Sequence, residues 1–104
     1  MAVFAIFTGK GFTKAMYEAL RHEVKWETHL APGGLMHASA FDAHGDLHVA
    51  DVWESEQQMN ECVGSRLIPG FKKLNIPMPD VTVFPMHNLN LYPDAKRYFL
   101  HPHA

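Results

Sequence analysis

The chain has 104 residues, of which 47% are apolar and 19% charged, and its formal net charge at pH 7 is −2. This composition is typical of one soluble globular domain, and the 9 basic residues against 11 acidic ones argue against a nucleic-acid-binding protein. The chain has no apolar run of about 18 residues, the length that a membrane-spanning helix needs. We therefore expect a single domain without nucleic-acid or membrane partners.

The N-terminal sequence lacks the basic region and the long apolar stretch of a signal peptide. The lone cysteine, Cys62, cannot form an internal disulfide, as is common in a reducing compartment. Both features favour a cytoplasmic protein.

The first half of the chain predicts a strand followed by a helix. Residues 2–8 are apolar and β-favouring, and Gly9 and Gly11 close the run. Apolar residues then recur at helical spacing, which predicts one buried stripe on a helix, at positions 12, 15, 16, 19, 20 and 24. Pro32-Gly33-Gly34 is a loop signal, so the helix is expected to end before it.

The middle of the chain predicts a hairpin. Residues 35–41 and 47–53 are two apolar runs, and His44-Gly45 between them can form a tight turn. A two-residue turn would place His37 opposite Val52, on the other face from Asp51, whereas a three-residue loop would place His37 opposite Trp53. The sequence permits both registers.

The remaining chain predicts a helix, a strand and a tail. Ser55 to Gln58 is a capping-box pattern, and one face of the helix that follows carries Met59, Cys62, Val63 and Leu67. Pro69-Gly70 should break or kink this helix. Residues 81–88 predict the last strand, and residues 89–104 form a tail with three aromatic side chains.

The order β-α-β-β-α-β is that of ferredoxin-like α+β folds. Right-handed crossovers then give a four-stranded antiparallel sheet in the order 4-1-3-2, with two helices on one face. Pro85 agrees with this order, because proline cannot donate to a ladder and the last strand lies at an edge. We expect a domain core at residues 2–88.

Both faces of the predicted sheet are apolar, although the helices can cover only one of them. The first strand has Val3 and Phe7 on one face and Phe4 and Ile6 on the other. Soluble monomers avoid exposed apolar patches of this kind, so we expect a homodimer whose sheets pack face to face. The alternative is a monomer whose tail folds over its own sheet. The eight histidines suggest a dimer that is sensitive to pH between about pH 5 and 7.

The junction between the third predicted strand and the second predicted helix carries a motif that is also found in a known protein family. Asp51-Val52-Trp53-Glu54-Ser55 runs directly into a capped helix, and in this respect the chain resembles the dimeric α+β barrel superfamily, most closely the antibiotic biosynthesis monooxygenase group. The resemblance implies a cofactor-independent monooxygenase that acts on a small aromatic or polyketide-like ligand in a pocket between sheet and helices. The superfamily also implies alternatives, namely a proton-transfer isomerase or lyase, or a non-catalytic ligand-binding or stress-related dimer.

Three side chains near the hairpin are the first candidates for a site. We predict His37 and Asp51 as a catalytic acid/base pair, because a carboxylate inside an apolar strand needs a partner. Trp53 lies two residues after Asp51 and so on the same face, and the resemblance implies that it packs a planar substrate. Each of the three residues also has a structural interpretation, as a satisfied core or interface residue.

His87 and Asn88, at the end of the last predicted strand, are weaker candidates for substrate binding. His22, His29, His44, His48, His101 and His103 are scattered over a helix, loops, a strand and the tail. They lack the spacing of zinc ligands. The middle of the second helix carries Cys62, Val63 and Gly64, where haem-degrading relatives carry a histidine ligand. We therefore expect no metal and no cofactor.

Overall fold

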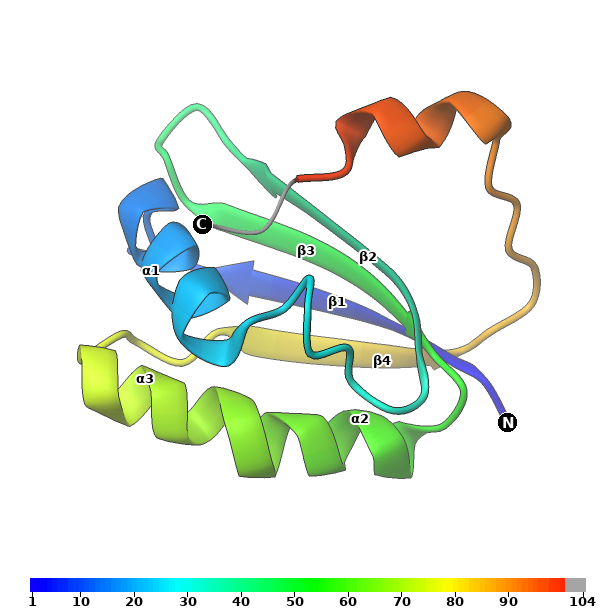
Figure 1. The fold of residues 1–104 in the computed structure, drawn as a ribbon, viewed down its shortest axis with the longest axis horizontal. Helices are drawn as coiled ribbons and strands as arrows, with labels where there is room; N and C mark the ends of the chain where they lie inside the picture. The colour runs from blue at the N-terminus through cyan, green and yellow to red at the C-terminus, as the bar shows by residue number, and fades with distance from the viewer. Residues whose placement is uncertain (101–104) are drawn as a thin grey trace.

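The computed structural model describes residues 1–100, and Figure 1 shows the labelled helices against one side of a twisted sheet. The elements in chain order are β1 Val3–Gly9, α1 Lys14–Val24, β2 Gly34–Phe41, β3 Leu47–Trp53, α2 Glu56–Cys62, η1 Val63–Leu67, α3 Ile68–Leu74, β4 Asp80–Pro85 and η2 Pro93–Tyr98. Thr13 and Ser55 cap α1 and α2, since their hydroxyl oxygens accept from Met16 N–H and Gln58 N–H.

The strand order β2-β3-β1-β4 confirms the predicted ferredoxin-like sheet. Strand β1 is central and antiparallel to both β3 and β4. Strand β4 is an edge strand that ends at Pro85, three residues before the predicted end. Proline cannot donate the next ladder hydrogen bond, and only Met86 N–H continues the pairing, to the carbonyl of Ala2.

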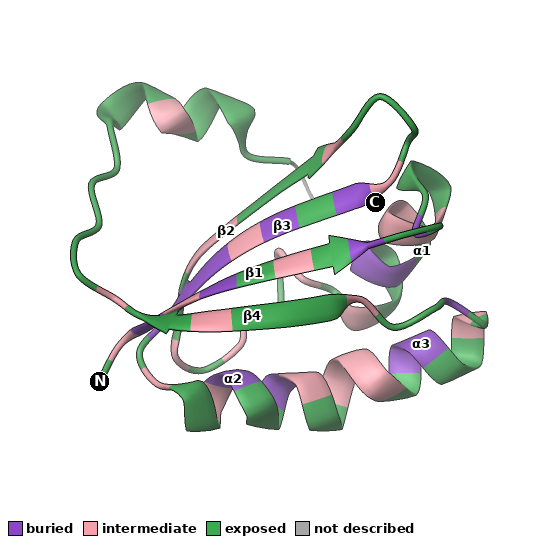
Figure 2. Cartoon of the chain, turned by 180° about the vertical axis from the view of Figure 1, so that it is seen from behind, coloured by how far each residue is buried: buried purple, intermediate pink, exposed green. Residues whose placement is uncertain are grey.

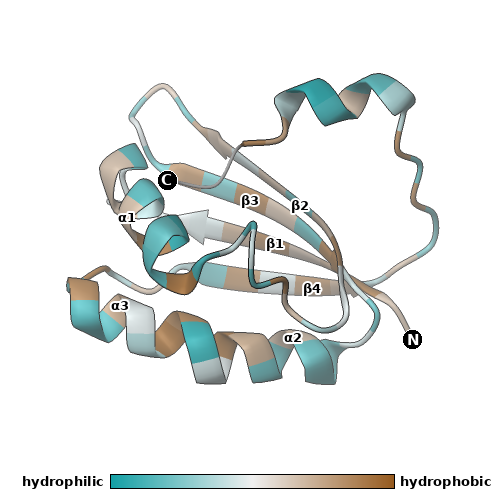
Figure 3. Ribbon diagram, in the orientation of Figure 1, coloured by the Kyte–Doolittle hydropathy of each residue, from teal (hydrophilic) through white to brown (hydrophobic). Residues whose placement is uncertain are grey.

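The core lies between the sheet and the helices. Buried residues alternate with more exposed ones along β1 and the first part of β3, whereas the last three residues of β3 are all buried (Figure 2). Figure 3 shows hydrophobic and hydrophilic bands alternating along β3. Two apolar clusters fill this layer. The first is built around Phe12, Leu20, Leu47, Val49, Phe71 and Ile76, and the second around Val3, Ala5, Trp53, Met59 and Cys62.

The buried face of α1 differs from the predicted stripe. Ala15 and Ala19 are exposed, whereas Leu20 and Arg21 are each only 7% exposed and Tyr17 packs against the first cluster. Alanine offers little apolar area to bury, so the helix instead turns its larger side chains inward. The predicted positions 12, 16, 20 and 24 are confirmed as core positions. Positions 15 and 19 were wrong, and Tyr17 and Arg21 face the sheet in their place.

The β2–β3 hairpin has neither of the predicted turns. Phe41 pairs with Leu47, and residues 42–46 form a five-residue connection. The carboxylate of Asp42 organises this loop, because it accepts from His44 N–H, Asp46 N–H and the His48 ring. Gly45 supplies the left-handed conformation that the loop needs, with φ 83°. The resulting register pairs His37 directly with Asp51.

These contacts of Asp42 make a testable prediction about pH. The bond to His48 and the two backbone bonds lower the pKa of Asp42 from 3.8 to about 2. A lowered pKa in the folded state contributes stability above pH 4, which is lost as the pH falls toward 2. We expect the difference in unfolding free energy between the wild type and Asp42→Asn to shrink over that range, as measured by urea unfolding. A difference that stays constant from pH 5 to pH 2 would contradict this role.

Helices α2 and α3 form one continuous rod, joined by the π-helical segment η1 (Figure 1). Pro69 was predicted to break or kink the helix, but it lies in the first turn of α3. Because proline has no N–H to donate to the preceding turn, the chain widens there, and Ile68 N–H bonds to the carbonyl of Val63 instead. The predicted face is confirmed: Met59 and Cys62 are buried, and Val63 and Leu67 are partly buried against the core.

The C-terminal segment leaves the sheet after β4 and arcs outward to η2 (Figures 1 and 2). Between residues 86 and 100 no residue belongs to either core cluster, and the side chains of Leu91, Tyr92, Tyr98 and Phe99 are at least half exposed. His101 and His103 lie outside the described residues. Over residues 1–100, no helix is long and apolar enough to cross a membrane.

Candidate functional site

The observed register brings His37, Asp51 and Trp53 into one hydrogen-bonded chain. His37 Nδ1 lies 2.7 Å from Asp51 Oδ1 across the β2–β3 pair. The other oxygen, Asp51 Oδ2, accepts from Trp53 Nε1 at 3.2 Å. The side chain of Asp51 is only 7% exposed, and the two bonds offset its removal from water. Both oxygens of this carboxylate are therefore occupied by neighbouring rings.

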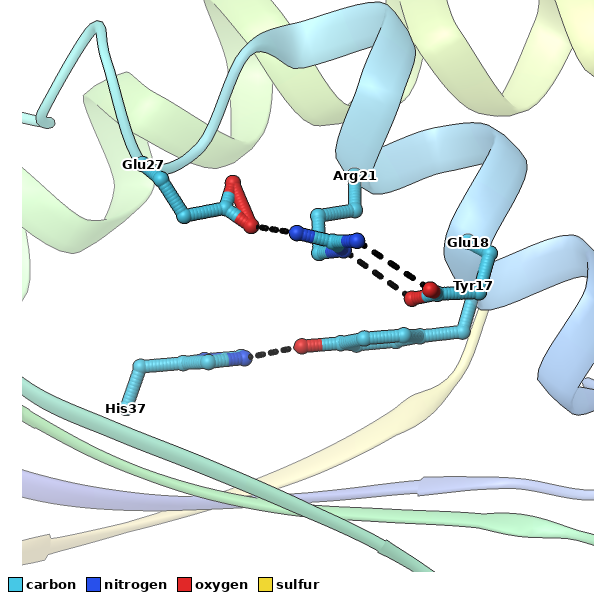
Figure 4. Close-up of polar contacts among 5 residues, drawn as sticks. All are labelled: Tyr17, Glu18, Arg21, Glu27 and His37. Carbon is cyan, nitrogen blue, oxygen red and sulfur yellow. Dashed lines mark hydrogen bonds and ion pairs between the residues drawn. The ribbon is translucent and has the colours of Figure 1, made fainter. Parts of the chain in front are cut away.

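The hydrogen bonds determine which nitrogen of His37 carries the proton. A carboxylate can only accept, so the Nδ1 nitrogen must donate to Asp51. In the neutral imidazole this leaves Nε2 as an acceptor, and Nε2 lies 2.7 Å from the hydroxyl oxygen of Tyr17. Figure 4 shows the two rings meeting end to end, with α1 placing Tyr17 over the sheet. The phenolic O–H therefore donates to His37.

Tyr17 is held as a neutral phenol. Burial is the main cause that raises its pKa above the ordinary value of 10, and Glu27 and Glu18 add to the rise, while a hydrogen bond with Ser39 and the charge of Arg21 oppose it. Because Tyr17 does not ionise near neutral pH, it can pass a proton along the chain but cannot act as the final base. Along the hydrogen bonds from Tyr17 to Asp51, His37 is the first side chain that can accept the proton.

Arg21 lies one helical turn after Tyr17 and carries a buried charge. Its guanidinium binds Glu18 through Nε at 2.9 Å and also binds Glu27 (Figure 4). The bond to Glu18 is the main cause that raises the pKa of Arg21, with Glu27 contributing, so the group stays charged at all working pH values. One positive charge thus faces two carboxylates, and the cluster presents no surplus positive charge.

A cavity of about 140 Å³ adjoins these groups. Its wall is mostly apolar, and its polar side chains are Tyr17, Arg21, His37, Asp51 and Asn60. The indole of Trp26 also lines it, with the ring centre 4.9 Å from that of His37. Arg66 lies over the Trp26 ring, 6.0 Å from its centre, and donates to the carbonyl of Val24 at 2.6 Å. A mostly apolar cleft with a few converging polar groups is the usual form of a ligand site.

The sequence candidates fall into two groups. His37 and Asp51 line the cavity and touch each other. Trp53 is 2% exposed and contacts Asp51, but its ring is not part of the cavity wall. His87 and Asn88 follow the end of β4, exposed and away from the cavity wall. In residues 1–100, no three His, Cys, Asp or Glu side chains are grouped as a metal ion would require.

Three residues of the site were missed by sequence reasoning, namely Tyr17, Arg21 and Trp26. Tyr17 and Arg21 are four residues apart and flank Leu20, so a search for polar residues beside the apolar stripe of α1 would have found them. Trp26 gives no comparable signal. It turns inward because Lys25, with φ 54°, ends α1 in a left-handed conformation.

Comparison with solved structures places this fold among known proteins. An antibiotic biosynthesis monooxygenase-like protein from Chloroflexus aurantiacus is 14% identical, with a TM-score of 0.61 over 86% of this chain and 98% of that one. SnoaB, a cofactor-independent oxygenase from Streptomyces nogalater, is 12% identical, with a TM-score of 0.61 over 85% of this chain and 94% of that one. A protein from Mycobacterium tuberculosis is 19% identical, with a TM-score of 0.58 over 85% and 95%.

No protein-family model and no curated protein matches the sequence. At these identities the structural likeness shows the ferredoxin-like α+β fold of the antibiotic biosynthesis monooxygenase-like proteins. Since one fold carries many activities, the chemistry has to be argued from the cavity and its side chains.

Proposed function

We propose that this chain, with the fold of cofactor-independent oxygenases, is an enzyme that removes a proton from a small acidic hydroxyarene and lets the resulting anion react with O2. The observation that carries the proposal is the chain Tyr17–His37–Asp51 in the cavity wall, with both links at 2.7 Å. A general base needs such hydrogen-bond reach and a group that orients it.

The proton follows the hydrogen bonds in order. A substrate hydroxyl donates to the Tyr17 oxygen, the Tyr17 proton moves to His37 Nε2, and the imidazolium that forms is stabilised by the carboxylate of Asp51. Trp53 is a positioning residue here, because its N–H holds the second oxygen of Asp51. A histidine base oriented by a carboxylate is also found in catalytic triads. Here the proposed base is His37, and Tyr17 stands between it and the substrate.

The oxygenation step balances without a cofactor. The anion of an electron-rich ring passes an electron to O2, and a C–O bond forms at the ring carbon opposite the hydroxyl. The C–H bond at that carbon and the phenolic O–H bond break. One oxygen atom enters the product, a quinone, and the other leaves as water. The protein supplies the base and a mostly apolar cleft that takes the ring out of bulk water.

The test is oxygen uptake by the purified chain, with chelator present and no added cofactor, over a panel of electron-rich hydroxyarenes. We expect stoichiometric formation of quinone and loss of O2, faster than in buffer alone. Uptake that is equal in His37→Gln and wild type would reject the proposal. Proton exchange or isomerisation without O2 uptake would identify a proton-transfer enzyme and reject oxygenation. No turnover and no exchange would favour the ligand-binding alternative.

We also propose that the chain works as a homodimer joined through the uncovered face of its sheet. Phe4 pairs with Phe84, and Ile6, two residues after Phe4, lies on the same face, opposite to the core residues Val3 and Ala5. The side chains of Ile6 and Phe84 are 39% and 48% exposed. Apolar side chains gathered on one face favour association.

A charge on this face should separate the dimer. We expect Phe84→Asp to shift the mass measured by light scattering from two chains to one at micromolar concentration, since an unpaired carboxylate in an apolar interface is costly. Gln57→Asp, on an exposed turn of α2, is the matched control and should remain dimeric. A wild-type chain that is monomeric at micromolar concentration would contradict the proposal.

A further inference from the structure

We infer that the ligand of this cavity is a neutral hydroxyarene with a single ring, and not a fused polycyclic or a carboxylated compound. The inference rests on the proposed function for the role of the hydroxyl group, but the limits on size and charge come from the cavity itself.

The volume of the cavity sets the size of the ligand. The cavity is partly open and has a volume of about 140 Å³, and an apolar protein cavity of about 150 Å³ is known to accept benzene. A ring with one or two small substituents therefore fills the space. A second or third fused ring would have to displace side chains, and overpacking of this kind costs about 1–3 kcal/mol, or roughly 5- to 150-fold in affinity.

The cavity wall consists of side chains that also form the core. Phe12, Leu47 and Phe71 are 1%, 3% and 5% exposed. Phe12 and Phe71 meet edge to face with their centres 6.0 Å apart, so neither ring can move without opening the first cluster. On the polar side, Trp26 is confined between His37 and Arg66. The space can therefore not widen at low cost.

The charges around the cavity exclude anions. The one guanidinium in the wall, Arg21, binds Glu18 and Glu27, and the wall also contains the carboxylate of Asp51. Arg66 lies behind Trp26, so two guanidinium groups stand near three carboxylates around the cavity. A carboxylate or phosphate on the ligand would lose its hydration in a mostly apolar space with this excess of nearby negative charge, and both effects would oppose binding. A phenol enters neutral and gives up its proton inside, which leaves the total charge of the site unchanged.

Binding of unreactive probes tests the inference separately from turnover. Isothermal titration would compare phenol, 2-naphthol, 2-hydroxyanthracene and 4-hydroxybenzoate. We expect phenol to bind, 2-naphthol to bind more weakly, and the three-ring and carboxylated probes to bind at least about tenfold more weakly than phenol. Equal or tighter binding of 2-hydroxyanthracene or 4-hydroxybenzoate would overturn the inference, as would no detectable binding of phenol.

A pair of variants shows whether the probe occupies this cavity. Val63 lines the cavity and Ser65 is exposed on the same π-helical segment. Val63→Phe should abolish phenol binding by filling the space, and Ser65→Phe should leave it unchanged; circular dichroism checks that both fold. Equal affinity in the two variants would overturn the assignment. Phenol binding, together with no oxygen uptake from any of the electron-rich hydroxyarenes, would reject the proposed function alone, and turnover of a three-ring substrate would reject this inference alone.

Discussion

Replacing His37 with glutamine should lower the rate of oxygen uptake by about 10²- to 10⁴-fold, the usual contribution of a general base. Glutamine keeps a polar group of similar length but cannot hold the transferred proton. The loss should fall on kcat more than on KM, because the cavity that binds the ring remains intact. The rate is measured with an oxygen electrode under saturating substrate.

His48→Gln is the matched control for this experiment. His48 is exposed on the same hairpin and hydrogen-bonds Asp42 at 2.8 Å, outside the cavity wall. It should retain the wild-type rate. Tyr17→Phe should resemble His37→Gln, since it breaks the path from the ligand to the imidazole. A Tyr17→Phe enzyme with full activity would show that the ligand contacts His37 directly. A fully active His37→Gln enzyme would show that His37 is not the general base.

The largest effect on stability is expected at Trp53. Trp53→Ala should reduce the free energy of unfolding by about 3–5 kcal/mol, because it empties the centre of the second core cluster. Urea unfolding followed by circular dichroism gives this value. Against a total of about 5–15 kcal/mol for an ordinary domain, the variant would be close to unfolding at room temperature.

Trp53→Phe separates the two roles of this side chain. Phenylalanine keeps most of the apolar volume but loses the N–H that Asp51 Oδ2 accepts. We expect a smaller loss, of about 1.5–3 kcal/mol, the usual worth of a hydrogen bond to a charged group, together with a lower rate of turnover from a less constrained Asp51. Equal destabilisation by alanine and phenylalanine would mean that ring volume is not what Trp53 contributes.

The fold was predictable because several independent signals agree on it. The apolar β-favouring runs, the helical spacing, the Ser55 cap and Pro85 at an edge strand all point to one topology. His37 and Asp51 were also predictable as candidates, since polar groups inside apolar strands need partners. Their direct pairing was not, because it depends on a five-residue loop held by Asp42, and residues 42–46 give no unique turn signal.

The remaining residues of the site, Tyr17, Arg21 and Trp26, could not be placed in the same way. Tyr17 and Arg21 displaced Ala15 and Ala19 from the buried face of α1, because large amphipathic side chains bury more area than alanine does. Trp26 reaches His37 through a left-handed residue in the segment before Pro32, for which the sequence predicted only that the helix ends. The position of Trp26 is determined by tertiary packing, which no local pattern in the sequence encodes.

The central claim, that this cavity removes a proton from a bound phenol, can be tested with 4-nitrophenol, whose phenolate is coloured. The absorbance of the phenolate is measured as protein is added, at a pH one unit below the pKa of the free phenol in water. We expect the wild type to raise the phenolate fraction of 4-nitrophenol on binding and His37→Gln to bind the same phenol in its neutral form. A bound phenol that stays neutral in the wild type, or ionises equally in both proteins, would contradict the claim.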